Sequence, residues 1–255
     1  MLMRASLAVV ALTMLTNDVN GQVWSIAGDG KRIVFPTESE VDSARAFALI
    51  QTLDDQMALI PDMLQGALQD RAITISLMPR SSMRVEGRAF PSTGVIVLPV
   101  PDAFEWSAPT RARVIRHELA HIGLAELLDY NRIPRWFEEG FAEWAAGGLT
   151  CEGEARVRLD VMRRNAGHIA LPSVGGPGQL ESSRLAYDYW GTVIEYIEGS
   201  YDNVIGKRIL IHAVKTHGIG RAFEIVLGRG VADIELEWHE YLRQMYGDIP
   251  VGYVC

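Results

Sequence analysis

Residues 113–123 read Arg-Val-Ile-Arg-His-Glu-Leu-Ala-His-Ile-Gly, and their apolar positions recur at the spacing of an α-helix. Ser107 can cap such a helix, and Pro109 suits its first turn because a proline there loses no hydrogen bond. The pattern therefore predicts a helix over about residues 108–129. Three apolar side chains are expected to point from it into a core: Ile115, Leu119 and Ile122.

Two histidines of this segment are spaced like metal ligands. His117 and His121 are four residues apart, so the predicted helix places them on one face, where they can bind one metal ion. Glu118 lies beside the pair and can act on a bound water. The alternative is two histidines on a solvated helical face, each with its own hydrogen-bond partner. A third ligand is needed to favour the metal site.

Carboxylates that can supply this ligand lie a short distance downstream. Pro134 can start a second helix, predicted over about residues 134–146, in which Glu139 and Glu143 share a face. One of the two can complete a zinc site with two His ligands and one Glu, while the other accepts the outer N–H of a ligating imidazole. Glu138 points about 100° away and is expected on a solvated face.

The two motifs together resemble those of a known family. The His-Glu-Leu-Ala-His of residues 117–121, followed by the Glu-Gly-Phe-Ala-Glu of residues 139–143, is similar to the gluzincin metallopeptidases, and the Pro-Arg-Trp of residues 134–136 resembles the peptidase MA-like family. The order of the predicted elements follows that family over residues 38–246. The resemblance implies a zincin-like domain that binds Zn²⁺ as its cofactor.

The resemblance also implies a role for each site residue. His117, His121 and Glu139 would bind the zinc, and Glu118 would be the general base; Glu143, which shares a helix face with Glu139, is then the carboxylate left to support a ligand. In related aminopeptidases a tyrosine at the start of a later helix donates a hydrogen bond to the oxyanion; by similarity this is Tyr187, with Tyr189 as the alternative. The Gly-Ala-Met-Glu-Asn motif, by which those enzymes hold a free N-terminus, is absent, which favours an endopeptidase over an aminopeptidase.

The rest of the chain predicts an α+β fold. Thr37 and Glu40 resemble a capping box at the start of a long amphipathic helix that runs to about Leu68. Short runs over residues 72–77, 83–89 and 94–100 predict a small antiparallel sheet packed on a predominantly helical domain. Helical patterns continue through residues 180–246, and nothing in the composition marks a domain boundary, so residues 22–255 are expected to form one unit.

The N-terminus has the pattern of an export signal. Arg4 precedes twelve uncharged, mostly apolar residues, 5–16, which is too short for a permanent membrane anchor. A cut after Gly21 would remove residues 1–21 and release a periplasmic or extracellular protein with no stable membrane span. In that oxidising compartment Cys151 and Cys255 are expected to form a disulfide.

The amino-acid composition excludes several classes of protein. The chain of 255 residues is 48% hydrophobic and 22% charged, which excludes a disordered or fibrous protein. It carries 24 Lys and Arg against 32 Asp and Glu, a net charge of -8, which argues against a nucleic-acid partner. With two cysteines, a metal site must be built from His and carboxylates.

These observations predict an exported zinc metallopeptidase that acts on peptides or proteins. Glu118 would assist the attack of zinc-bound water on the peptide carbonyl. Residues 94–100 are expected to pair with an extended substrate by strand addition. The alternative is a non-catalytic exported peptide-binding or assembly protein on a peptidase fold; the presence of Glu118 beside the histidines argues against it.

Overall fold

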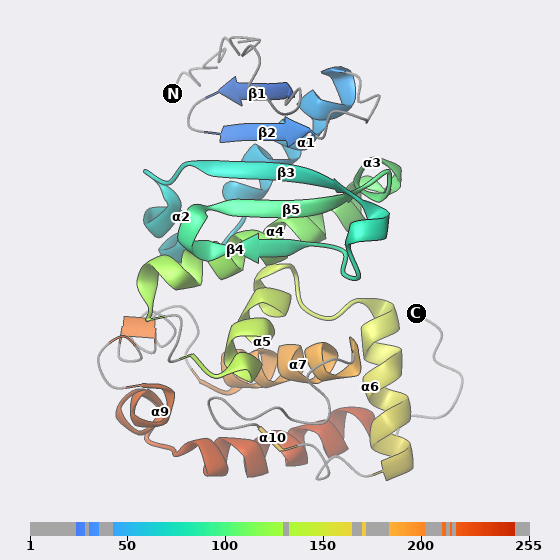
Figure 1. Ribbon diagram of the computed structural model, residues 1–255. Helices are drawn as coiled ribbons and strands as arrows, with labels where there is room; N and C mark the ends of the chain where they lie inside the picture. Colours follow the sequence, from blue (N-terminus) through green and yellow to red (C-terminus); the bar gives the residue numbers. More distant parts are fainter. Residues whose placement is uncertain are drawn as a thin grey trace, which may run out of the picture. The chain divides into compact units, whose positions relative to one another are not determined.

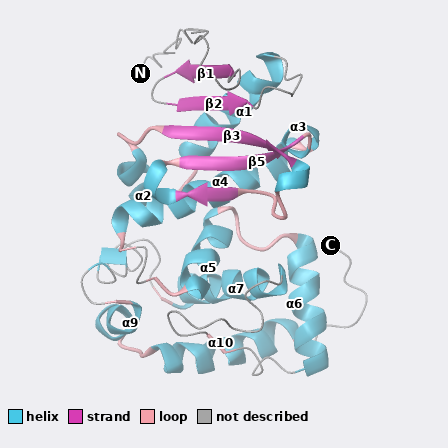
Figure 2. Ribbon diagram, viewed as in Figure 1, coloured by secondary structure: helices cyan, strands magenta, loops and turns pink. Residues whose placement is uncertain are grey.

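The computed structural model describes residues 24–28, 31–35, 43–129, 133–164, 170–171, 184–201, 211–212, 215 and 218–247. The predicted signal peptide, the capping box of Thr37 and Glu40, and Cys255 lie outside these ranges. Within them, helices combine with one small sheet (Figures 1 and 2), so the predicted α+β class is confirmed. None of the described helices is both long and apolar enough to cross a membrane.

The chain divides into two compact units. The first comprises residues 1–59 and 68–119, and the second comprises residues 60–67 and 120–255. One of the boundaries falls inside a single helix, α4 (Ala108–Leu127). A boundary within a continuous helix has no linker and no change of composition, so local sequence patterns do not mark it.

The first unit is built on a five-stranded sheet in the order β1-β2-β3-β5-β4. Its strands are β1 (Trp24–Gly28), β2 (Lys31–Phe35), β3 (Ile73–Pro79), β4 (Arg88–Phe90) and β5 (Val95–Val100). The outer pairs are antiparallel, but β2–β3 and β3–β5 are parallel. The sheet is therefore mixed, not antiparallel as predicted. Parallel pairing depends on how the connecting segments cross over the sheet, which local patterns do not encode.

Two further differences concern single strands. The predicted strand over residues 83–89 is mostly loop, and only its end belongs to β4. Strand β5 has β3 on one side and β4 on the other, so both of its edges are occupied. The expectation that residues 94–100 pair with a substrate is therefore wrong, and β4 forms the edge of the sheet instead.

The segment predicted as one long helix is two helices. These are α1 (Ser43–Met57), which packs on β2, and α2 (Asp62–Leu68). Pro61 lies at the start of α2, and its carbonyl accepts hydrogen bonds from the N–H groups of Leu64 and Gln65 at 2.7 and 3.1 Å. Since proline has no N–H to continue a preceding helix, α1 ends before it. Between α2 and α4, the described elements outside the sheet are two 3₁₀ turns, η1 (Arg80–Ser82) and η2 (Pro91–Thr93), and the short helix α3 (Asp102–Glu105).

Besides most of α2, the second unit contains the C-terminal part of α4 and a group of helices around α7. They are α5 (Arg135–Ala145), α6 (Cys151–Arg164), α7 (Arg184–Ser200), α9 (Ile219–Leu227) and α10 (Val231–Tyr246). Helix α7 packs on α5, α6 and α10. Gly147, Gly218 and Gly228 lie between these helices, and all three adopt positive φ angles. Cys151 is disulfide-bonded, which agrees with the expectation for this residue.

Helices α5 and α7 approach each other through glycines. A Cβ atom at Gly140 would collide with the main-chain carbonyl of Trp190, and one at Gly191 would lie 3.3 Å from Cβ of Glu143. Backbone cannot move aside as a flexible side chain can. The absence of a side chain at residue 140 is therefore a condition of this packing.

Replacing Gly140 with Ala is expected to lower the free energy of unfolding by about 1–3 kcal/mol, because the added methyl group overpacks the contact between α5 and α7. Gly199→Ala is the control. It lies in α7, where an added methyl group would meet no described atom within 4 Å, so helix propensity should make the change neutral or stabilising. Urea denaturation measures both changes, and equal stability of the two variants would contradict the packing argument.

Candidate metal centre

Helix α4 carries the histidine motif, as predicted. The Ser107 hydroxyl accepts a hydrogen bond from the N–H of Thr110 at 3.3 Å and so caps the start of the helix. The three apolar side chains expected in the core are fully buried: Ile115, Leu119 and Ile122. Their burial fixes the rotation of the helix about its axis, so the opposite face presents His117 and His121.

Helix α5 carries the carboxylates and is buried on nearly every side. Pro134 lies just before it, and the N–H groups of Phe137 and Glu138 donate to its carbonyl. Within α5, all residues except Arg135 and Trp144 are buried. Trp136, Phe137 and Phe141 are buried in the core.

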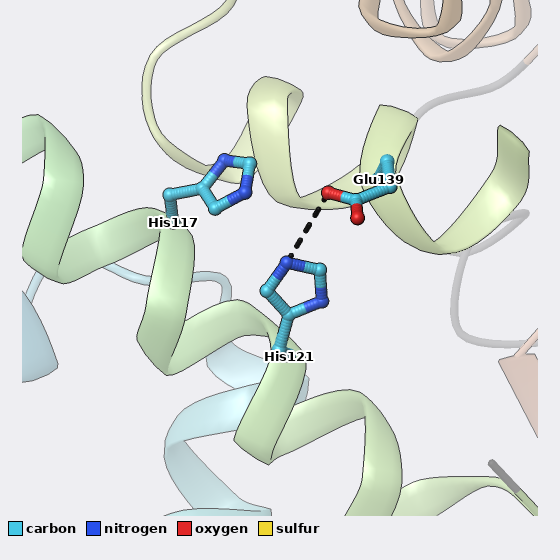
Figure 3. Close-up of side chains that lie close together, drawn as sticks. All are labelled: His117, His121 and Glu139. Atoms are coloured by element: carbon cyan, nitrogen blue, oxygen red, sulfur yellow. Dashed lines mark ion pairs between the residues drawn. The ribbon is translucent and has the colours of Figure 1, made fainter. Parts of the chain in front are cut away.

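Three side chains from these helices form a compact donor set. One ligand atom of each of His117, His121 and Glu139 lies within 4.8 Å of the other two (Figure 3). Nε2 of His121 is 3.4 Å from Oε2 of Glu139. A tetrahedral zinc ion with bonds of about 2.1 Å holds its ligand atoms roughly 3.4 Å apart. The spacing of this pair and the N₂O donor chemistry therefore fit zinc.

Glu138 is part of the same group, and the prediction that it lies on a solvated face is wrong. Its side chain is buried, and Oε1 lies 2.9 Å from Nδ1 of His121, which is ion-pair distance. Because α5 is buried on nearly every side, Glu138, about 100° away from Glu139, still faces protein rather than water. His121 therefore has a carboxylate at each ring nitrogen.

These carboxylates change the acid–base behaviour of His121. Burial by itself lowers the pKa of an imidazole, but the negative charges of Glu139 and Glu138 outweigh it and raise the pKa of His121 well above its ordinary value. The surroundings therefore favour a positive charge at this position. Either a proton on the ring or a metal cation bound to it supplies that charge.

Glu118 lies next to the main chain of Gly87, the residue that precedes β4. The Glu118 side chain is buried, and a Cβ atom at Gly87 would lie 2.6 Å from its Oε1. A side chain at residue 87 would have to displace the carboxylate. The loop before β4 thus leaves space that Glu118 occupies.

Glu143 is buried as deeply as a core residue. Its Oε1 lies 3.2 Å from Nη1 of Arg184. The carboxylate of Glu138 lies next to Nδ1 of His121. Support of a ligand by Glu143 stays a prediction.

The two tyrosines considered from the sequence occupy different surroundings. Tyr187 is half-buried in the first turn of α7, and its hydroxyl oxygen accepts a hydrogen bond of 2.9 Å from Nη2 of Arg135. Tyr189 is fully buried, and its hydroxyl donates to Oδ2 of Asp160 at 3.0 Å. The geometry therefore brings Tyr187, and not Tyr189, close to the donor set.

The state of the Tyr187 hydroxyl follows from its neighbours. Burial and the charge of Glu139 raise the pKa of Tyr187, while Arg135 opposes the shift without cancelling it. The phenol is therefore protonated at neutral pH and able to donate a hydrogen bond.

Sequence reasoning misses three contributors to this region: Gly87, Arg135 and Glu138. Arg135 and Glu139 have opposite charges four residues apart, a spacing that does predict an ion pair, and Nη2 of Arg135 lies 3.2 Å from Oε1 of Glu139. No local pattern connects Gly87 with Glu118, because the contact joins segments about thirty residues apart.

Comparison with known proteins gives a distant structural likeness. No protein-family model matches the chain, and no curated protein matches it. A solved structure of the M1 zinc metallopeptidase from Deinococcus radiodurans, a point mutant bound to a Tyr-Ser-Ala substrate, aligns with 87% of this chain and 49% of that chain, with a TM-score of 0.43 and 16% identity. This chain thus spans about half the length of that one. A likeness at this level carries no argument about function.

Proposed function

We propose that this protein is an exported zinc-dependent peptidase, more specifically an endopeptidase of the gluzincin type. The observation that carries the proposal is the donor set of His117, His121 and Glu139, with its 3.4 Å spacing between Nε2 of His121 and Oε2 of Glu139. Three protein ligands leave a fourth position open, which is the arrangement of catalytic rather than structural zinc.

The remaining residues supply the proton and hydrogen-bond chemistry. Zinc, when bound, makes water a nucleophile near neutral pH and polarises the carbonyl of the substrate. Glu118 is the base that accepts a proton from the attacking water and passes it to the leaving amine. Tyr187 donates a hydrogen bond to the oxygen on which negative charge develops.

The position of β4 favours extended peptides as substrates. β4 pairs with β5 on one side, and on the other side no strand of the described chain pairs with it. Gly87, which precedes β4, lies against Glu118. An extended peptide added along this edge would pass the general base, and main-chain pairing binds an internal segment without requiring a free terminus.

Metal analysis together with an unbiased peptide library tests this function. We expect one zinc ion per chain and cleavage within peptides, and we expect the secreted protein to begin at residue 22. A wild-type protein that takes up no zinc when zinc is offered would contradict the metal site. Zinc binding without any cleavage would instead favour the alternative, a non-catalytic protein that binds peptides.

Tyr187→Phe is expected to lower turnover by about 100-fold while zinc content and substrate affinity stay nearly unchanged, because the lost hydrogen bond forms only in the transition state. Tyr189→Phe is the control. It removes a buried hydrogen bond to Asp160, so it should lower the free energy of unfolding by about 1–3 kcal/mol but leave turnover intact. Steady-state kinetics and urea denaturation separate the two effects. Loss of turnover in Tyr189→Phe alone would contradict the assignment.

A further inference from the structure

Arg135 connects two residues to which the proposed function gives separate roles. Its Nη2 atom donates to the hydroxyl oxygen of Tyr187 at 2.9 Å and lies 3.2 Å from Oε1 of Glu139. A guanidinium Nη carries two hydrogens, so one nitrogen can serve both oxygens. Arg135 is the first residue of α5, Glu139 lies one turn later, and Tyr187 belongs to α7.

We propose that Arg135 is a positioning residue that holds the ligand carboxylate of Glu139 and the hydroxyl of Tyr187 in a fixed mutual arrangement. The inference rests on the proposed function and adds to it a residue that acts through Glu139 and Tyr187. Arg135 would have two effects, one on the metal ligand Glu139 and one on the oxyanion donor Tyr187.

The effect on Glu139 comes from how its two oxygens are used. Oε2 lies 3.4 Å from Nε2 of His121, whereas Oε1 lies next to Arg135. With Oε1 engaged by a cation, the carboxylate presents Oε2 alone to a metal and cannot rotate freely. Outer partners of this kind orient a ligand and strengthen metal binding.

The effect on Tyr187 comes from the direction of its hydrogen bond. Arginine has donors and no acceptor, so the hydroxyl of Tyr187 accepts from Arg135 and keeps its own hydrogen for another partner. The Tyr187 ring also packs edge-on against Trp190, with the ring centroids 5.6 Å apart. The ring contact and the guanidinium together fix the oxygen and leave its O–H available to an oxyanion.

A merely structural role does not fit the exposure of Arg135. Its side chain is 48% exposed, and the buried carboxylate of Glu139 keeps its contact with His121 when Arg135 is replaced. Loss of the side chain should therefore alter the site without unfolding the protein. This makes the positioning role measurable by itself.

The test compares Arg135→Met and Arg135→Lys with Arg221→Met, an exposed arginine of α9 paired with Glu224. We expect Arg135→Met to bind zinc about 10- to 100-fold more weakly in competition with a chelator. With zinc saturating, it should lower kcat and leave KM nearly unchanged. Arg135→Lys keeps the charge without the planar fork and should lie between Arg135→Met and the wild type. Arg221→Met should match the wild type in every measurement.

A double variant separates the two effects. If Arg135 acts on turnover through Tyr187, then Arg135→Met in the Tyr187→Phe background should lower kcat no further at saturating zinc, while still weakening zinc binding. Wild-type zinc affinity and kcat in Arg135→Met would overturn the inference, and so would multiplicative losses of kcat in the double variant. Failure of the proposed function shows differently, as a wild-type protein that neither binds zinc nor cleaves peptides.

Discussion

Replacing Glu118 with Gln is expected to lower peptide hydrolysis by roughly 100- to 10,000-fold, the range for losing a positioned general base. Gln has nearly the same shape, so it fits beside Gly87, but it cannot accept a proton from water at neutral pH. Zinc content and stability should therefore stay at wild-type values. Steady-state kinetics, elemental analysis and thermal unfolding of the same preparation measure the three quantities together.

Glu126→Gln is the matched control for this variant, since Glu126 is an exposed glutamate on the same helix. It should retain wild-type activity. Undiminished hydrolysis in Glu118→Gln would show that another group takes the proton. Zinc loss in Glu118→Gln would show that the carboxylate holds the metal site together and would remove the basis for assigning it as the base.

Replacing His121 with Ala is expected to abolish stoichiometric zinc binding. The substitution removes one of three ligands, so it should weaken affinity by more than the roughly 10- to 100-fold that loss of an outer partner costs. It also leaves the buried carboxylates of Glu138 and Glu139 facing each other without the cation between them. Elemental analysis after dialysis against a weak chelator measures the zinc per chain.

His212→Ala serves as the comparison, because His212 is an exposed histidine outside the donor set. It should keep one zinc per chain. Full zinc occupancy in His121→Ala would contradict the proposed ligand set. Equal loss in both variants would show that the metal is bound nonspecifically through exposed histidines.

The part of the site that depends on short-range patterns can be predicted from the sequence. Local patterns predict the first site helix over residues 108–129, and it runs from Ala108 to Leu127; they predict the second over 134–146, and it runs from Arg135 to Ala145. Helical periodicity, a capping serine and a proline act within a few residues of one another, so the sequence contains them completely. The same periodicity places His117 and His121 on one face.

The parts that depend on long-range packing cannot be predicted in this way. The parallel pairing of β3 with its neighbours follows from chain crossovers, and β1 and β2 are not among the predicted strands. The burial of Glu138 depends on what surrounds α5, not on the sequence of α5. The same holds for Gly87, which matters because it leaves space for the carboxylate of Glu118, a residue far from it in the sequence.

The glycine contact between α5 and α7 also limits which variants of this protein selection can accept. Glu139 precedes Gly140 on α5, and Tyr187 lies one turn before Gly191 on α7, so the separation of the two helices sets the distance between the ligand and the tyrosine. The fold could accommodate a side chain at residue 140 if α5 and α7 moved apart. That movement would carry Tyr187 away from Arg135. Under the proposed function, a substitution at this contact would therefore change stability and turnover together, and added heat resistance would have to come from other parts of the fold.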